Sequence, residues 1–190
     1  MNGGHLRSLN LNQNRIGTKG VQLICEAMRD NQMVESLFLN GNGIDTDGAY
    51  ALSKVLVSSS LRELHVAENK IASCGLAVMM ETIAKHNKKL KFLDIAYNVI
   101  DIGILRALRQ MLEKNTALNY LSISGLHKFN QRAIHSLQES LSLNSGLKLI
   151  DLKRTTRPFL FAMDHGANLL RLEGRRPKLI FLHDSVFLSS

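Results

Sequence analysis

A nine-residue pattern recurs along most of this chain at a nearly constant interval. The pattern is L-x-x-L-x-[LIV]-x-x-N, and its clearest copy runs from Leu90 to Asn98. Copies start at residues 6, 34, 61, 90, 118 and 147, so successive starts lie 28, 27, 29, 28 and 29 residues apart. An interval of about 20 to 50 residues is typical of stacked-repeat architectures, in which each unit covers the apolar face of the next. The repeat therefore predicts a single solenoid.

Each repeat contains two different hydrophobic periods. Apolar residues two apart, such as Leu37 and Leu39, predict a short half-buried strand. Apolar residues three and four apart, such as Leu105, Leu108 and Leu112, predict a helix in the second half of the repeat. We expect helix N-caps twelve places after the repeat starts, at Thr18, Thr46, Ser73 and Asn130. Gly20, Gly48 and Gly75 then follow, where a small residue would let each helix lie close to the strand layer.

The predicted fold is therefore α/β: a right-handed βα superhelix shaped as a horseshoe, with a parallel sheet on the concave face and helices outside. A helix is wider than a strand, so the stack must curve. Asparagines follow the strands, at Asn14, Asn42, Asn69 and Asn98. We expect their amides to bond the turns of neighbouring repeats, a structural role rather than a binding site.

The repeats divide the chain into three parts. Residues 1–5 are expected to be a disordered or vector-derived start, residues 6–155 the repeat domain, and residues 156–190 a C-terminal cap. Two strand-like runs flank Gly174–Pro177, which predicts a hairpin within that cap. The alternative is that this tail belongs to a larger neighbouring segment. At the other end, Leu6–Leu11 would be an unpaired strand edge, through which the chain could self-associate.

Composition limits the class of protein. With 190 residues, 45% apolar and 21% charged, the chain is typical of a globular domain. It has no apolar run of the roughly 20 residues that a membrane span needs, and no secretory signal at Met1–His5. Two cysteines without metal or disulfide spacing favour a reducing, cytoplasmic location. The net charge of +8 favours an acidic partner.

No pattern in the sequence indicates catalysis. His127 and His135 lack neighbouring ligands in a metal-binding register, and His183–Ser185 has the letters of a triad but not its distant positions. Nucleotide-binding glycine motifs are missing. The basic residues cluster on turns, without a phosphate-binding track, at Lys85, Lys88, Lys89, Lys91, Arg171, Arg175, Arg176 and Lys178. We therefore expect a non-enzymatic protein without cofactor or metal, and nucleic-acid binding is disfavoured.

The concave face is the predicted binding surface. Side chains between the core residues of each strand should point away from the helices, and several of them are aromatic. Large aromatic side chains on a solvated sheet often form the centre of a protein interface. The candidate partner-binding residues are Phe38, His65, Phe92, Asp94, Tyr97, Tyr120 and Asp151. Alternatively, these rings pack on one another or lie under the C-terminal tail.

A 28-residue unit of the form LxxLxLxxNxIxxxGxxxLxxxL resembles the ribonuclease-inhibitor-like class of leucine-rich repeats. Residues 6–152 carry the resemblance, although Leu126 and Thr155 replace the expected Asn and Arg132 the expected Gly. The resemblance implies a scaffold that binds a protein partner on its concave face, within a cytoskeletal or axonemal assembly. The alternative that it implies is the repeat half of a regulatory protein, either a NOD-like sensor or a GTPase regulator.

Overall fold

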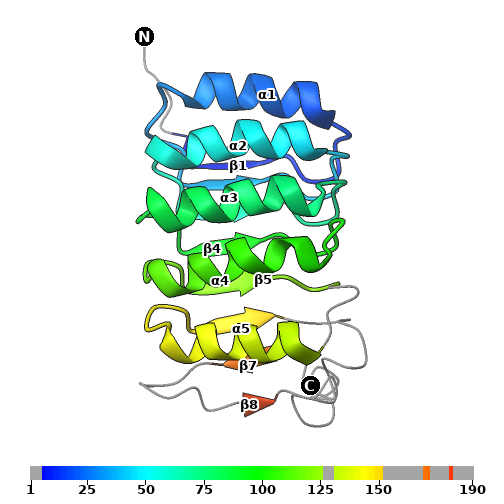
Figure 1. Cartoon of the computed structure of the whole chain (residues 1–190). Helices are drawn as coiled ribbons and strands as arrows, with labels where there is room; N and C mark the ends of the chain where they lie inside the picture. The colour runs from blue at the N-terminus through cyan, green and yellow to red at the C-terminus, as the bar shows by residue number, and fades with distance from the viewer. Residues whose placement is uncertain (1–5, 126–130, 152–168, 172–179, 182–190) are drawn as a thin grey trace, which may run out of the picture.

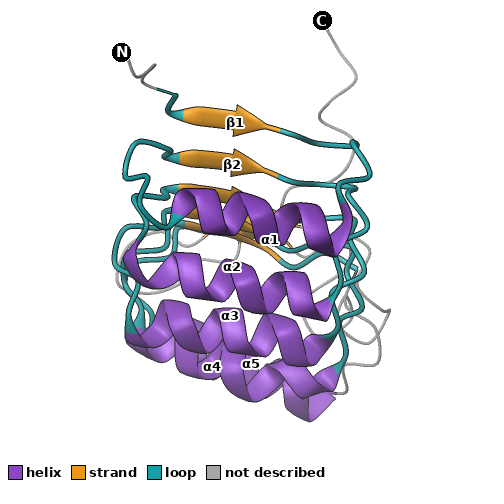
Figure 2. Cartoon of the chain, turned by 90° about the horizontal axis from the view of Figure 1, so that it is seen from above, coloured by secondary structure: helices purple, strands orange, loops and turns teal. Residues whose placement is uncertain are grey.

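The computed structural model describes residues 6–125, 131–151, 169–171 and 180–181. Within these ranges the chain forms two layers, a sheet on one side and a stack of helices on the other (Figures 1 and 2). The elements alternate strictly between strand and helix from β1 to β6. This arrangement confirms the predicted α/β leucine-rich repeat solenoid.

The sheet grows by one short strand per repeat, in chain order. Its repeat strands are β1 (Ser8–Asn10), β2 (Ser36–Phe38), β3 (Glu63–His65), β4 (Phe92–Asp94), β5 (Tyr120–Ser122) and β6 (Leu149–Asp151). Neighbouring repeat strands are parallel, and the register places equivalent positions side by side, so that Leu37 lies opposite Leu64 and Leu64 opposite Leu93. The central residue of each strand from β2 to β6 is buried.

The helices lie side by side behind the sheet in the same order. They are α1 (Gly17–Met28), α2 (Thr46–Ser58), α3 (Ser73–Lys85), α4 (Leu105–Lys114), preceded by the 3-10 turn η1 (Ile102–Ile104), and α5 (Gln131–Leu143). The apolar core fills the space between the two layers. Because each helix is about 10 Å wide and adjacent strands are about 4.8 Å apart, the helix side must spread more than the strand side.

Three of the four asparagines after the strands, Asn42, Asn69 and Asn98, form a buried column, as predicted. Asn14 in the first repeat differs: it is exposed, and its Nδ2 donates to the Asn12 carbonyl oxygen of its own turn. Asn69 is representative: its Oδ1 accepts hydrogen bonds from the backbone N–H groups of Asn42 and Ile44, both at 3.0 Å. Its Nδ2 donates to the carbonyl oxygens of Leu39, Val66 and Ala67 at 2.9–3.0 Å. Asn42 and Asn98 make the same kind of bonds to the repeat before them. The column, Asn42, Asn69 and Asn98, therefore joins each repeat to its predecessor.

A second asparagine column stands where the helices end. Asn115 donates from Nδ2 to the carbonyl oxygens of Ile83 and Asn87, in the preceding repeat. Its Oδ1 accepts the N–H groups of Ala117 and Leu118, which close its own turn. Asn87 and Asn144 are held in the same way. Both edges of the strand layer are thus pinned by amide side chains.

The predicted helix N-caps are wrong for α1, α2 and α3. Thr46 is the first residue of α2, whose cap is Asp45; the Asp45 carboxylate accepts from the N–H groups of Asp47 and Gly48. The predicted cap hydroxyls instead accept a backbone N–H from the next repeat, which ties adjacent turns together. These bonds are Asp45 N to Thr18 Oγ1, Ala72 N to Thr46 Oγ1 and Asp101 N to Ser73 Oγ. Asn130 lies outside the described residues.

The helix glycines have a different neighbour from the one we expected. A Cβ atom on Gly48 would clash with the side chain of Ile44, in the turn between β2 and α2, and would lie 2.9 Å from Val21 Cγ1. Val21 belongs to α1, so the missing side chain lets α2 lie close to its own turn and to the preceding helix. Gly75 stands in the same relation to Ala49 of α2, with a Cβ separation of 3.1 Å.

Two further strands follow the repeats. β7 (Leu169–Arg171) pairs antiparallel with β6, and β8 (Ile180–Phe181) pairs antiparallel with β7. They coincide with the two strand-like runs of the sequence. The residues between them and the rest of the tail lie outside the described ranges, as do residues 1–5. The predicted boundaries at residues 6 and 155, and the cap, therefore stay predictions.

Candidate functional site

We define the concave face as the first and third residues of strands β1 to β6. Because the second residue points into the core, these side chains stand on the side of the sheet away from the helices. They are Ser8, Asn10, Ser36, Phe38, Glu63, His65, Phe92, Asp94, Tyr120, Ser122, Leu149 and Asp151. This set contains three carboxylates and no Lys or Arg.

Four of these side chains form one continuous stack, the ring ladder: Phe38, His65, Phe92 and Tyr120. Their ring centroids are 4.5 Å apart from Phe38 to His65, 4.5 Å from His65 to Phe92, and 4.0 Å from Phe92 to Tyr120. The ladder starts on the third residue of β2 and β3 and crosses to the first residue of β4 and β5. Of the alternatives left open by the sequence, packing of the rings on one another is confirmed.

Carboxylates border the ladder. Asp94 Oδ2 lies 3.8 Å from His65 Nδ1, and Asp94 Oδ1 accepts the Ala96 N–H at 3.1 Å. The Asp151 carboxylate accepts the Ser124 hydroxyl at 3.0 Å. Burial, followed by the charges of Asp151 and Asp94, raises the pKa of Tyr120 to about 12. The phenol is therefore neutral at physiological pH, and negatively charged carboxylates lie near its hydroxyl.

Tyr97 stands at the edge of the concave face with an unusual backbone. The eighth residue of each of the first five repeats adopts the left-handed region, with φ between +52° and +82°: Gln13, Gly41, Glu68, Tyr97 and Gly125. An asparagine follows in the first four of these repeats, and Leu126 follows Gly125. A non-glycine residue there is strained, and an aromatic one is uncommon. Tyr97 is 40% exposed, and its Cδ1 would lie 3.1 Å from a Cβ on Gly125. Its ring thus stays accessible to solvent, although the positive φ of this residue favours glycine.

A basic row, the strand-start rim, borders the other side of the concave face. It consists of the residues immediately before each strand: Arg7, Glu35, Arg62, Lys91, Asn119 and Lys148. The Glu35 carboxylate lies 3.6 Å from Arg7 and 3.4 Å from Arg62, and Lys91 Nζ donates to the Ala117 carbonyl oxygen. A polar hollow of about 300 Å³ opens at this rim, lined by Arg62, Lys88, Lys89 and Lys91 among others.

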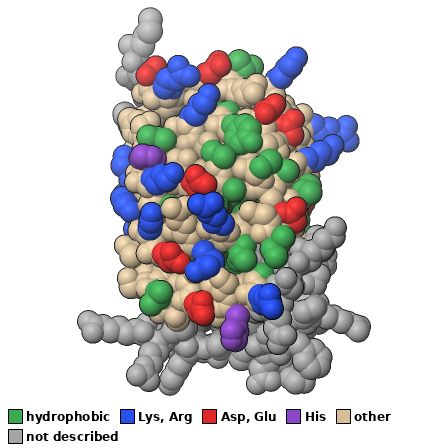
Figure 3. All heavy atoms as spheres, in the orientation of Figure 1, with side chains coloured by type: hydrophobic (Ala, Val, Ile, Leu, Met, Phe, Trp, Pro, Cys, Tyr) green, Lys and Arg blue, Asp and Glu red, His purple; other side chains and the backbone are tan. Residues whose placement is uncertain are grey.

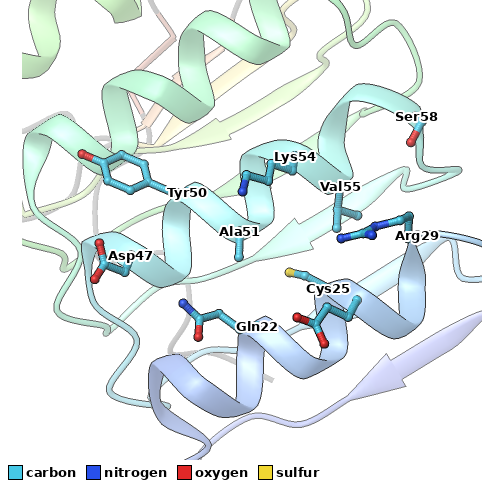
Figure 4. A pocket seen from close by; sticks show the side chains of 10 residues that line it. Gln22, Cys25, Arg29, Asp47, Tyr50, Ala51, Lys54, Val55 and Ser58 are labelled. Atoms are coloured by element: carbon cyan, nitrogen blue, oxygen red, sulfur yellow. The ribbon is translucent and has the colours of Figure 1, made fainter.

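The helix side carries a larger hollow, of about 500 Å³, between α1 and α2 (Figure 4). Cys25 stands against it, and burial raises the pKa of this thiol to about 12, so it is not a nucleophile at neutral pH. Charged residues of both signs line the hollow, including Arg29, Asp47 and Lys54. The same mixture of charges, with a group of apolar side chains between them, covers the helix face in Figure 3. This surface has neither the single sign of charge nor the stacked rings of the concave face.

The structure brings most of the predicted binding residues together. Phe38, His65, Phe92 and Tyr120 form the ladder, Asp94 and Asp151 border it, and Tyr97 lies at the edge. Sequence reasoning omitted Glu63 from the candidates and did not identify the strand-start rim. Glu63 lies two places after its repeat start, and the rim residues lie one place after theirs. Comparing each of these two positions across the repeats would have found both. Whether these residues bind a partner stays a prediction.

Among the residues that the structure describes, no group of three His, Cys, Asp or Glu side chains is arranged to hold a metal ion. None of the helices that the structure describes has the length and apolar character required to cross a bilayer.

Comparison with known proteins identifies the repeat. A family model described as a leucine-rich repeat matches residues 5–25, 30–53 and 86–108. The chain is 30% identical over 128 residues to a ribonuclease inhibitor of Mus musculus, which covers 63% of this chain and 28% of that protein. It is 30% identical over 145 residues to NACHT, LRR and PYD domains-containing protein 14 of Homo sapiens, which covers 75% of this chain and 12% of that protein. The chain thus spans less than a third of either curated relative.

Solved structures agree with this result at the level of the fold. The chain is similar to the tropomodulin C-terminal domain of Caenorhabditis elegans, with a TM-score of 0.61, 19% identity and coverage of 73% of this chain and 84% of that one. It is also similar to leiomodin-1 actin-binding site 2, with a TM-score of 0.59, 20% identity and coverage of 73% and 80%. Its period, its asparagine column and these likenesses agree: the segments that the family model matches are leucine-rich repeats, and the chain is similar to ribonuclease inhibitor in their sequence.

Proposed function

We propose that this chain is a non-enzymatic scaffold that binds a protein partner on its concave face, with the ring ladder at the centre of the contact. The observation that carries this proposal is the ladder itself. Its rings are intermediate in exposure and lie outside the apolar core between the two layers. Aromatic side chains dominate binding energy at interfaces because they bury a large area at a small cost in conformational entropy.

The strained backbone of Tyr97 supports the same role. A glycine at this position would remove the strain, as Gly41 and Gly125 do in the second and fifth repeats. Strained residues cluster at functional sites, where they position a side chain that the fold itself does not need. A partner on the ladder that also reaches the edge of the sheet would contact this ring.

The partner's assembly is proposed from the relatives. The two similar solved structures are a leiomodin-1 segment and a tropomodulin domain, and the leiomodin-1 segment is named as an actin-binding site. On that basis we propose a cytoplasmic, cytoskeletal assembly, axonemal ones included. Co-sedimentation with actin filaments tests this directly: the chain should pellet with filaments, and a chain that stays in the supernatant at every filament concentration excludes actin.

A second candidate function is the repeat half of a regulatory protein. The similarity to several NACHT, LRR and PYD domains-containing proteins favours it, since alignments over 48–78% of this chain recur among them. A regulator of a GTPase is the other form of this candidate. Rates of GTP hydrolysis by small GTPases, measured with and without the chain, test that form; unchanged rates exclude it.

The concave face is tested by substitution. The variant Phe38→Ala, Phe92→Ala, Tyr120→Ala removes the aromatic side chains of the ladder except His65. The matched control, Tyr50→Ala, Val57→Ala, Val78→Ala, removes three exposed side chains from the helix side. Proteins captured by the wild type should be lost with the ladder variant and kept by the control. Equal capture by all three folded proteins, as judged by circular dichroism, refutes the concave-face proposal.

A further inference from the structure

The turns at the two edges of the sheet differ in charge. The turns that run from the end of a helix to the next strand contain six Lys or Arg residues and two carboxylates: Arg29, Arg62, Lys88, Lys89, Lys91 and Lys148, with Asp30 and Glu35. The described turns that run from the end of a strand to the next helix contain two Lys or Arg residues and three carboxylates: Arg15 and Lys70, with Asp45, Glu68 and Asp101. Positive charge is therefore in excess at the edge where the strands start.

Several of these cations surround the polar hollow of about 300 Å³ at the strand-start rim, which we call the rim hollow. Its cationic lining residues are Arg62, Lys88, Lys89 and Lys91, and its one carboxylate among the described lining residues is Glu35. Glu35 is already engaged, since its Oε2 lies 3.4 Å from Arg62 Nε. Lys88 and Lys89 are exposed and have no ion-pair partner among the residues that the structure describes. The rim hollow therefore presents positive charge that the described part of the fold does not neutralise.

The sheet register holds two of these cations side by side. The Lys91 backbone N–H donates to the Arg62 carbonyl oxygen at 2.8 Å, so the two residues stand next to each other on adjacent strands. Like charges on neighbouring strands repel each other. A carboxylate placed between these two side chains would remove that repulsion.

The lysines of the hollow have no evident role in stabilising a helix. Basic residues near the end of a helix interact favourably with its dipole, but this effect is confined to the last turn. Helix α3 ends at Lys85, and Lys88 and Lys89 lie beyond it in the turn to β4. Binding of an external anion is the better explanation for these two side chains.

The surroundings of the hollow favour an acidic peptide over a nucleic acid. A single strand of nucleic acid needs a continuous row of cations for its phosphates and exposed aromatic faces for its bases. Glu35 and Asn119 interrupt the row of cations along the strand-start rim, and the rings of the ladder cover one another's faces. An acidic peptide needs only a local group of cations.

We propose that an acidic segment of the protein partner enters the rim hollow, where its carboxylates pair with Lys88, Lys89 and Arg62. This inference rests on the proposed function and adds a second contact of stated chemistry beside the concave face. Lys91 of the hollow directly precedes Phe92 of the ring ladder, so one partner can reach both. The acidic partner that the net charge of +8 favours thereby acquires a place on the molecule.

Three labelled peptides of equal length test the sign of charge. Each repeats Gly-Ser followed by Glu, Gln or Lys, and fluorescence anisotropy measures its binding to the wild type at low ionic strength. The Glu peptide should bind about tenfold more tightly than the Gln peptide, and added salt should reduce this difference because it screens exposed charges. A Glu peptide that binds no more tightly than the Gln peptide or the Lys peptide overturns the proposal.

Substitutions locate the binding. The rim variant, Lys88→Gln, Lys89→Gln, should weaken binding of the Glu peptide about fivefold. The matched control, Lys19→Gln, Lys70→Gln, removes the same net charge from exposed positions near the opposite edge of the sheet and should weaken it less than about twofold. Circular dichroism should show that both variants are folded. Equal weakening by the two variants indicates attraction to the net charge alone and overturns the proposal.

A single-stranded RNA and vesicles that contain phosphatidylserine distinguish the class of partner. The rim variant and the control should reduce the binding of either probe equally, as expected for attraction to net charge. A loss of binding that is confined to the rim variant shows that the hollow recognises phosphate groups, and it overturns the acidic peptide segment.

Capture of the protein partner separates this inference from the proposed function. The rim variant should capture less partner than the control does. If the ladder variant loses its captured partner but the rim variant keeps it, the concave face binds a partner and the inference of an acidic segment fails. If the ladder variant keeps the partner, the proposed function itself fails, and the peptide measurements still decide whether the rim hollow binds acidic segments.

Discussion

Two rows of side chains, the strand-side asparagines and the ring ladder, run through this molecule with one member per repeat, and they differ in burial. The strand-side asparagines, Asn42, Asn69 and Asn98, are almost fully buried, and both ends of each amide are bonded within the fold. The ring ladder also has one member per repeat, but it crosses from the third to the first strand position and lies on the outer surface of the sheet. Its rings contact one another and keep one side toward solvent. The repeats therefore carry one row that is fully bonded inside the fold and one that is partly exposed.

The two rows differ in whether the fold requires their side chains to form hydrogen bonds. A buried amide must find partners because an unpaired buried polar group costs free energy, so the asparagine column can be explained completely by the fold. The ladder has no such requirement, since a serine occupies the equivalent surface position in β1 and β2. Residues that the fold does not need are the ones for which binding is the better explanation.

The largest expected effect is the loss of a bond from the buried column. Asn69→Ala removes the acceptor for two N–H groups and the donor to three carbonyl oxygens. We expect a loss of about 4 kcal/mol in the free energy of unfolding, because several buried groups lose their partners at once. Urea denaturation measures it. Asn12→Ala, at a less buried position in the first repeat, should cost under about 1 kcal/mol; equal losses would remove the distinction between the column and other turn asparagines.

The ladder should show the opposite pattern, with a large effect on binding and a small one on stability. Phe92→Ala should weaken partner binding by about 2 kcal/mol while lowering the free energy of unfolding by about 1 kcal/mol through lost ring contacts. Isothermal calorimetry with the captured partner, beside urea denaturation, separates the two quantities. A stability loss as large as that of Asn69→Ala, with unchanged binding, would make the ladder structural.

Tyr97 offers a test in which the two quantities change in opposite directions. Tyr97→Gly relieves the left-handed strain at φ 52° and should raise the free energy of unfolding by about 0.5 kcal/mol, after the entropic cost of glycine. The same change removes an exposed ring, so partner binding should weaken. The matched control is Glu68→Gly, at the equivalent turn, which should stabilise without the same loss of binding. Unchanged binding in Tyr97→Gly would exclude Tyr97 from the interface.

The smallest effect concerns the pH dependence of stability. The pKa of Tyr120 is raised from 10.0 to about 12 in the folded chain, so the folded state holds this proton more tightly than the unfolded state. The resulting stabilisation is complete below pH 10 and is lost as pH rises toward 12. Denaturation at several pH values should show stability falling across this window, and a shallower fall in Tyr120→Phe. A residual slope is expected from Cys25, whose pKa is raised from 9.0 to about 12.

The sequence predicts the periodic part of this structure well. Alternating pairs such as Leu37 and Leu39 identify the strands, and an interval near 28 residues places Leu37 opposite Leu64 in parallel register. Asn69 is correctly identified as structural because a buried amide after a strand needs partners from a neighbouring turn, here that of the preceding repeat. These features are local or repeat exactly, so one copy explains the others.

The remaining features depend on which repeats lie side by side. Thr46 and Ser73 look like helix caps, but their hydroxyls accept N–H groups from the following repeat, a contact that no single repeat contains. The stacking of His65 on Phe92 joins different positions of two strands, so a column reading by position misses it. The net charge of +8 likewise averages over surfaces and does not show that the concave-face positions carry three carboxylates while Arg and Lys gather in the row beside them.

The backward direction of the amide bonds has a mechanical consequence. Each asparagine side chain hydrogen-bonds to the repeat before it, so every pair of adjacent repeats resists tension applied along the axis separately. The pair joined by the fewest of these hydrogen bonds should separate first. The chain carries Leu126 and Thr155 where the next two asparagines of the strand-side column are expected. Pulled from its two ends, the molecule should part after its fourth repeat, and the first four repeats should separate as one block.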